Sequence, residues 1–216
     1  MKRKKKSVKF SNFEAWEPYY QEILDYFSFD REKDEEAAML LSTLLTRDDS
    51  AVLERACRGA TVTVCGNAPC LCDELQTIEG TVWAADAATE VLVAQGIRPS
   101  AVFTDLDGAT ELFCTINTQG TIMVVHAHGD NMPLLRFWVP KFRGPVVGTT
   151  QSHPLPRVHN FGGFTDGDRA VFAAHALGAV KVNLIGFDLD DPTVDPMKRG
   201  KLRWARRLLG LLGHEL

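Results

Sequence analysis

The chain has 216 residues, of which 45% are hydrophobic and 24% charged, with a formal net charge of −4. This length accommodates one α/β domain with a small appendage, and the charge balance provides no basic field that would attract nucleic acid. No apolar run approaches the roughly 20 residues of a membrane span, and five cysteines without a secreted-domain pattern predict reduced thiols and a cytoplasmic location.

The first 58 residues differ in character from the rest of the chain. Residues 1–10 are basic and lead into polar and aromatic residues, which predicts a frayed terminus rather than a secretory signal. Residues 11–58 carry many acids and space their apolar residues at helical intervals, so we expect two or three helices that pack on the main body. We therefore divide the chain into an N-terminal helical segment, 1–58, and an α/β domain, 59–216, that ends in a basic helix.

From Ala60 onward, strand-like and helix-like segments alternate. Apolar runs predict strands at 61–65, 81–85, 101–104, 121–127, 145–149 and 180–186. Helices fit between several of them, notably at 87–95 and 168–177, and Gly96 and Gly178 stand where C-terminal glycine caps belong. This alternation predicts an α/β fold with a doubly wound, mostly parallel sheet.

Two neighbouring strands of this pattern end in acidic residues. Asp86 follows the strand 81–85, and Asp105 and Asp107 follow the strand 101–104. Because ligands of parallel sheets bind outside the carboxyl ends of the strands, we expect the three carboxylates to converge in one crevice. A turn explains Asp105 and Asp107 alone, but three converging carboxylates repel one another unless a cation lies between them. Oxygen ligands suit Mg²⁺, so the pattern predicts a magnesium-bound phosphate substrate.

The strand 121–127 leads into a polar stretch that contains His126, His128, Asp130 and Asn131. Residues i and i+2 of a strand share a face, so both imidazoles can point into the crevice. The spacing permits a zinc site, although no third histidine or cysteine pair follows to complete it. The alternatives to zinc for these two histidines are contact with a substrate or phosphate, and a packing role. Asp130 and Asn131 can orient a ligand or form an Asx turn.

Gly66 and Asn67 lie between a predicted strand and a predicted helix start, where backbone N–H groups can hold an anion or the edge of a heterocycle. The chain contains neither a G-x-x-x-x-G-K-[ST] sequence nor a G-x-G-x-x-G sequence. Any nucleotide is therefore bound without a P-loop or a dinucleotide fingerprint.

The second dense group of polar residues lies at 160–169. Gly163 lets the backbone pass close to a ligand, and Thr165 or Asp166 can cap the helix that begins near Asp168. Capping does not require two acids and an arginine in succession. We therefore expect Asp166 near the metal or ligand, and Arg169 near a phosphate.

Asp188 follows the last predicted strand, and residues 197–216 form a basic amphipathic segment. Such a helix can dock on the sheet while Lys198 and Lys201 reach the rim of the active site, or it can bind a membrane or a partner. We favour docking.

These segments together resemble the archaeal 6-hydroxymethyl-7,8-dihydropterin pyrophosphokinase family, which is related to the catalytic domain of thiamine pyrophosphokinases. The stretches that carry the resemblance are TDLDG (104–108), HAHGDN (126–131), GGFTDGDRA (162–170), IGFDL (185–189) and KRGKLRWA (198–205). One departure follows Gly66 and Asn67, where Ala68, Pro69 and Cys70 replace the expected glycine, proline and serine. The resemblance implies a cytoplasmic enzyme that uses Mg²⁺ and ATP for pterin synthesis, and it allows for a homodimer.

Under this resemblance the enzyme transfers a diphosphate from ATP to the hydroxymethyl group of the pterin. The metal ligands would be Asp105 and Asp107, with Asp86 either as the third ligand or as the group that orients the hydroxymethyl group. Asp166 and Arg169 would be further catalytic groups. The residues expected to bind ATP or the pterin are Gly66, Asn67, His126, His128, Asp130, Asn131, Gly163, Thr165, Asp168, Asp188, Lys198 and Lys201.

Two other functions remain as alternatives. A thiamine pyrophosphokinase carries a β-sandwich after its catalytic domain, and about thirty residues after Gly186 leave too little sequence for one. A non-catalytic nucleotide-binding or membrane-associated regulator would use the basic tail as its anchor, but it has no need for three converging acids. We therefore prefer the pterin enzyme.

Overall fold

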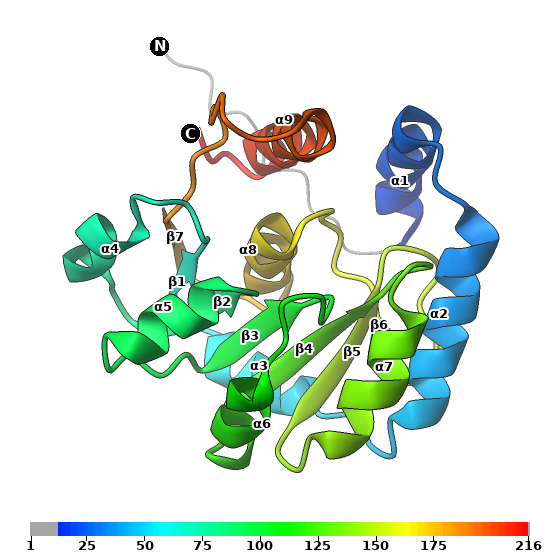
Figure 1. Ribbon diagram of the computed structural model, residues 1–216, viewed down its shortest axis with the longest axis horizontal. Helices are drawn as coiled ribbons and strands as arrows, with labels where there is room; N and C mark the ends of the chain where they lie inside the picture. The colour runs from blue at the N-terminus through cyan, green and yellow to red at the C-terminus, as the bar shows by residue number, and fades with distance from the viewer. Residues whose placement is uncertain (1–12, 216) are drawn as a thin grey trace.

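The computed structural model describes residues 13–215, which form a seven-stranded sheet with helices on both of its faces (Figure 1). The strands are β1 (Thr61–Cys65), β2 (Thr81–Ala85), β3 (Ala101–Thr104), β4 (Ile122–Ala127), β5 (Val146–Thr150), β6 (Val158–His159) and β7 (Lys181–Ile185). They lie in the order β6-β5-β4-β3-β2-β1-β7, and every neighbouring pair is parallel. The predicted doubly wound parallel fold is confirmed. The basic start, residues 1–10, lies outside the described part of the chain.

The helices divide between two apolar cores, one on each face of the sheet. One core contains residues of α1 (Phe13–Phe27), α3 (Ser50–Cys57), α8 (Asp166–Ala176) and α9 (Pro196–Leu211). The other contains residues of α2 (Arg31–Leu44), α4 (Leu71–Glu74), α5 (Ala88–Ala94), α6 (Glu111–Thr118) and α7 (Met132–Trp138). Short 3₁₀ turns follow α4 and α7, at Leu75–Thr77 and Val139–Lys141. The N-terminal segment thus supplies three helices, and they cover both faces.

The order in which successive strands join the sheet reverses at β1. Strands β1 to β6 follow one another across the sheet, whereas β7 returns to the other side of β1 after α8 has crossed the opposite face. Such a switch point opens a crevice at the carboxyl ends of the two strands involved. The fold therefore places a natural ligand site where β1 and β7 end.

The last helix, α9, is docked on the body of the protein. Trp204, Leu208 and Leu209 are buried in the same core as α8, and Figure 1 shows α9 beside α1 at the top of the molecule. Its apolar face is therefore already covered, which favours the docked helix over the membrane anchor. Within residues 13–215, no helix combines the length and the apolar character that crossing a bilayer requires.

Candidate functional site

The register of the sheet brings the predicted polar residues to one edge. Ala85 pairs with Phe103, so Asp86 comes to lie beside the end of β3. Thr104 pairs with Val125, and Ala127 pairs with Thr150 at the ends of β4 and β5. The residues that follow these strands therefore meet at the carboxyl edge, as the parallel sheet predicts.

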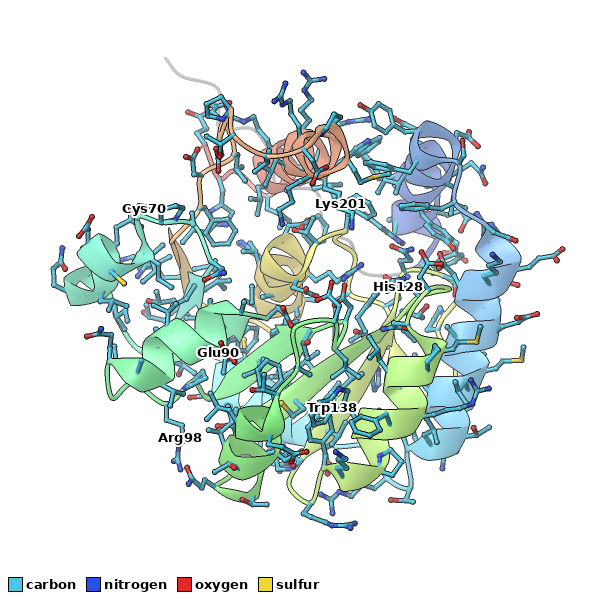
Figure 2. All side chains as sticks on the ribbon, viewed as in Figure 1. Cys70, Glu90, Arg98, His128, Trp138 and Lys201 are labelled. Carbon is cyan, nitrogen blue, oxygen red and sulfur yellow. The ribbon has the colours of Figure 1, made fainter. Side chains whose placement is uncertain are left out.

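A cleft of about 650 Å³ opens along this edge, between the strand ends, the α1–α2 loop and α9. Figure 2 shows Lys201 on the side of α9 that faces the sheet, with His128 across from it. Thirteen of the predicted residues line the cleft: Gly66, Asn67, Asp86, Asp105, Asp107, His128, Asp130, Thr165, Asp166, Arg169, Asp188, Lys198 and Lys201. Residues from seven separate segments of the chain thus share one cavity.

Three of these carboxylates form a compact cluster. Asp86, Asp105 and Asp107 each offer an oxygen, and the three oxygens lie within 4.8 Å of one another. Within residues 13–215 this is the one group of three or more ligating side chains that could hold a metal ion. An all-oxygen donor set fits Mg²⁺ rather than Zn²⁺, so the residues present suit the metal that the sequence predicts.

The backbone around this cluster adopts conformations that bring the acids together. Asp86 has φ of 42° and the buried Leu106, which separates the other two acids, has φ of 74°. Such left-handed residues are uncommon outside glycine and often mark functional sites. Gly108 leaves room for the cluster, because a Cβ at this position would lie 2.4 Å from Asp86 Oδ2.

The electrostatics of Asp86 and Asp107 show the repulsion within the cluster. Burial, followed by the charges of Asp107 and Asp105, raises the pKa of Asp86 to about 6, although the Thr104 hydroxyl donates a hydrogen bond of 2.6 Å to it. Burial and the neighbouring Asp105 likewise raise the pKa of Asp107, and Lys201 opposes the shift. A bound cation would relieve both effects.

Asp105 behaves differently because hydrogen bonds and the charge of Arg169 favour its ionised form. Burial alone would raise its pKa, but contact with His128 and the charge of Arg169 outweigh that effect and hold the pKa below its ordinary value. His128 Nε2 lies 3.6 Å from Asp105 Oδ2. Asp105 therefore stays ionised, which a metal ligand requires.

Asp166 and Arg169 lie on the first turn of α8 and project into the cleft. Arg169 donates a hydrogen bond of 3.2 Å from its NH1 group to Asp166 Oδ1, and its Nε is buried without a partner among the described residues. Burial and the charge of Asp105 raise the pKa of Asp166 well above its ordinary value, against the charge of Arg169. The guanidinium thus keeps donors for a further anion, such as a phosphate.

Four predicted ligand-binding residues lie behind the cleft wall: His126, Asn131, Gly163 and Asp168. His126 is buried and shares a hydrogen bond of 3.2 Å between its Nδ1 and the Thr149 hydroxyl. Asn131 donates to the carbonyl oxygens of Asp105 and His126, at 2.8 and 2.7 Å. Both residues therefore brace the loops that carry the carboxylates and His128.

Gly163 and Asp168 hold the start of α8. Asp168 accepts hydrogen bonds from the backbone N–H groups of Phe164 and Thr165 and from the Thr165 hydroxyl, forming a capping box. Gly163 has φ of 90°, and a Cβ there would lie 2.6 Å from the Arg169 Cα. Because the cap is Thr165, the helix begins at Asp166, two residues before the predicted start.

The β1–α4 loop closes the other end of the cleft. Gly66 and Gly186 approach so closely that a Cβ on either one would lie within 2.5 Å of the other's carbonyl oxygen. The N–H of Ala68 donates to that carbonyl of Gly186 at 2.9 Å. This contact joins the ends of β1 and β7 at the switch point, although the predicted glycine after Asn67 is absent.

The cleft also contains residues that sequence reasoning missed, among them Phe29, Lys33, Asp34, Gln151 and Phe187. A signal for Asp34 was present, because it shares the buried stripe of α2 with Ala37, Ala38 and Leu41 at helical spacing. Gln151 directly follows β5 and so occupies a strand-end position like those of the acids.

Comparisons with known proteins identify the family of this chain. The sequence matches the family model described as 6-hydroxymethylpterin diphosphokinase MptE-like over residues 36–193. A protein of Methanothermobacter thermautotrophicus named 6-hydroxymethyl-7,8-dihydropterin pyrophosphokinase is 40% identical, across 92% of this chain and 94% of its own. Proteins of the same name from Pyrococcus furiosus and Methanocaldococcus jannaschii are 38% and 32% identical, across 91% and 93% of this chain and 92% and 95% of their own. The chain belongs to the 6-hydroxymethylpterin diphosphokinase MptE-like family.

Proposed function

We propose that this protein transfers a diphosphate group from ATP to the hydroxymethyl oxygen of 6-hydroxymethyl-7,8-dihydropterin, and that it requires Mg²⁺. The observation that carries the proposal is the cluster of Asp86, Asp105 and Asp107 in a cleft of about 650 Å³. Relatives that align along nearly their whole length bear the name of the pterin pyrophosphokinase.

The residues that would hold Mg²⁺ are the three clustered aspartates. When bound, the ion supplies positive charge that neutralises the phosphate oxygens of ATP. Asp105 is the anchor of this set, since the contact with His128 and the charge of Arg169 hold its pKa low. The hydrogen bond from the Thr104 hydroxyl orients the Asp86 carboxylate toward the same point.

The cationic side chains around the cleft would bind the polyphosphate. Arg169 approaches from α8, and Lys198 and Lys201 approach from α9 on the opposite wall. Phosphoryl transfer has little covalent chemistry for a protein to perform, so fixed cations and correct alignment account for most of the catalysis. Arg169 is the best positioned of them, because its contact with Asp166 restricts the guanidinium.

The reaction balances without any further reactant. The hydroxymethyl oxygen attacks the β-phosphorus of ATP and loses its proton. The bond from that phosphorus to the oxygen bridging the α-phosphorus breaks, and AMP leaves with that oxygen. The products are AMP, the pterin diphosphate and one proton, which passes to water.

Measuring AMP release from ATP and Mg²⁺, with the pterin or with thiamine as the acceptor, tests the proposal. We expect AMP only with the pterin. Formation of AMP with thiamine would support diphosphate transfer but would show that thiamine, and not the pterin, is the acceptor. If AMP forms neither with the pterin nor with thiamine, the proposed reaction is refuted.

A further inference from the structure

A buried polar network forms the wall of the cleft beside the α1–α2 loop. The Asp34 side chain is buried, and its Oδ2 accepts hydrogen bonds from the Tyr20 hydroxyl at 2.8 Å and from Gln151 Nε2 at 2.7 Å. Its Oδ1 accepts a hydrogen bond of 2.9 Å from the Gly129 N–H. Both Asp34 and Gln151 line the cleft. The network therefore connects α1, α2 and the ends of β4 and β5 at the ligand site.

The Gln151 side chain has only one permitted orientation. Asp34 already accepts hydrogen bonds from the Gly129 N–H and the Tyr20 hydroxyl, and the amide nitrogen of Gln151 donates to it as well, so the amide oxygen of Gln151 faces away from Asp34. The backbone of Gln151 is also held, because its carbonyl oxygen accepts hydrogen bonds from Trp16 Nε1 at 2.9 Å and from Asn160 Nδ2 at 3.0 Å. Gln151 Oε1 is thus a fixed acceptor.

This acceptor has no partner of its own. Gln151 is 4% exposed, and none of residues 13–215 donates a hydrogen bond to its Oε1. A buried acceptor without a donor is costly, and native structures rarely keep one without a reason. An N–H group of a ligand in the adjoining cleft would satisfy it.

The cleft that Asp34 and Gln151 line also has an aromatic wall. Phe29 and Phe164 both line it, with ring centroids 6.4 Å apart. Phe27 packs behind them, its ring 5.2 Å from that of Phe29 and tilted by only 14°. Flat aromatic faces beside a buried acceptor suit a planar heterocycle that carries N–H donors.

The hydrogen-bonding pattern distinguishes the two heterocycles of the proposed reaction. A pteridine presents two adjacent donors, its 2-amino group and N3–H, whereas the corresponding edge of adenine presents one donor and one acceptor. Asp34 and Gln151 offer acceptors here, because the Gly129 N–H and Gln151 Nε2 are already used as donors to Asp34. The wall therefore matches the pteridine edge.

We propose that Gln151, oriented by Asp34, binds the amino-pyrimidinone edge of the pteridine between the α1–α2 loop and the ends of β4 and β5. The inference rests on the proposed function. The hydroxymethyl group lies at the opposite end of the pteridine, so it would face the rest of the cleft, which contains the aspartate cluster. Gln151 selects the acceptor substrate, and Asp34 is a positioning residue.

The variant Asp34→Asn tests the orientation. Its amide can still accept from the Gly129 N–H, but its nitrogen then faces Gln151. The Gln151 amide must turn, so that it presents a donor where the wild type presents an acceptor. We expect the dissociation constant of 6-hydroxymethyl-7,8-dihydropterin, measured calorimetrically without ATP, to rise by about 10- to 100-fold. The dissociation constant of ATP should not change.

A ligand with the opposite hydrogen-bonding pattern provides a second test of the orientation. The analogue that carries an oxo group in place of the 2-amino group presents an acceptor to Gln151. Wild-type protein should bind it poorly, and Asp34→Asn should bind it better than wild type does. A merely structural role for the network would not reverse the preference between the two ligands.

Tyr20→Phe is the matched control, because it removes one donor to Asp34 while Gln151 keeps its orientation. Its pterin affinity should equal that of wild type. If thermal unfolding shows that Asp34→Asn is not folded, Gln151→Met tests the inference instead. It should raise the dissociation constant of the pterin by the same factor and leave that of ATP unchanged. Wild-type pterin affinity in either folded variant, or an equal loss for ATP, overturns the inference and leaves the proposed function intact. Wild-type protein that binds no pterin overturns both.

Discussion

Replacing Asp107 with asparagine is expected to stabilise the metal-free protein while it removes turnover. Asp107 has two carboxylate neighbours with oxygens within 4.8 Å. At that distance two unit charges repel by about 3.5 kcal/mol at an effective dielectric constant near 20, and by about 1 kcal/mol in water. Asp107 is the most exposed of the three, so the lower part of the range applies. Removal of its charge should therefore add about 1–2 kcal/mol to the free energy of unfolding.

The assay is urea unfolding in EDTA and again with Mg²⁺. At about 100 times its dissociation constant, Mg²⁺ should add about 2.7 kcal/mol to the free energy of unfolding of wild type. It should add much less to Asp107→Asn. The rate of AMP release should fall by at least about 100-fold, the scale on which loss of one preorganised charged group acts.

Asp73→Asn is the control for charge removal, because Asp73 lies on α4 and does not line the cleft. It should leave both the Mg²⁺ effect and turnover unchanged. A destabilised Asp107→Asn in EDTA would refute the repulsion argument. An Asp107→Asn variant that keeps the full Mg²⁺ stabilisation would show that the metal binds elsewhere.

Three further predictions follow from the site and its supports. Gly108→Ala places a Cβ 2.4 Å from Asp86 Oδ2, so the carboxylate must move, and AMP release should fall while circular dichroism stays unchanged; normal turnover would contradict this. The raised pKa of Asp86, about 6 against 3.8 in the unfolded chain, means that the folded state holds the proton more tightly. The contribution of Asp86 to stability is therefore fully present below pH 3.8 and is lost as the pH rises to about 6. Urea titrations in EDTA should show Asp86→Asn becoming more stable relative to wild type across that pH range. A difference in the free energy of unfolding that does not change with pH would disprove the raised pKa. Leu208→Ala in α9 removes a fully buried side chain and should lower the free energy of unfolding by about 2–5 kcal/mol; a loss near zero would mean that α9 is not docked in solution.

Much of the secondary structure could be predicted because local signals coincide with it. The strands β1, β2 and β3 have the predicted bounds, since short apolar runs end at polar or glycine residues. Gly96 and Gly178 have φ of 77° and 86°, as the expected helix caps require. The two-residue strand β6 was not predicted, because so short a pairing leaves no periodic pattern.

The sequence by itself determined that the three carboxylates converge. Residues that follow neighbouring parallel strands lie at one edge of the sheet, and Asp86, Asp105 and Asp107 do so. It could not separate the residues in the cleft from their supports. His128 lines the cavity while His126, two residues earlier, is buried behind it. Such differences depend on how strand ends curve and on what packs against them.

Only the tertiary structure decided which side chains share the ligand wall. Asp34 and Gln151 are 117 residues apart and meet through a hydrogen bond of 2.7 Å. Their contact exists because α2 folds back onto the ends of β4 and β5, an arrangement that no local periodicity encodes. Residues on neighbouring strands can be placed by register alone, whereas contacts between a helix and distant loops depend on the packing of the whole core.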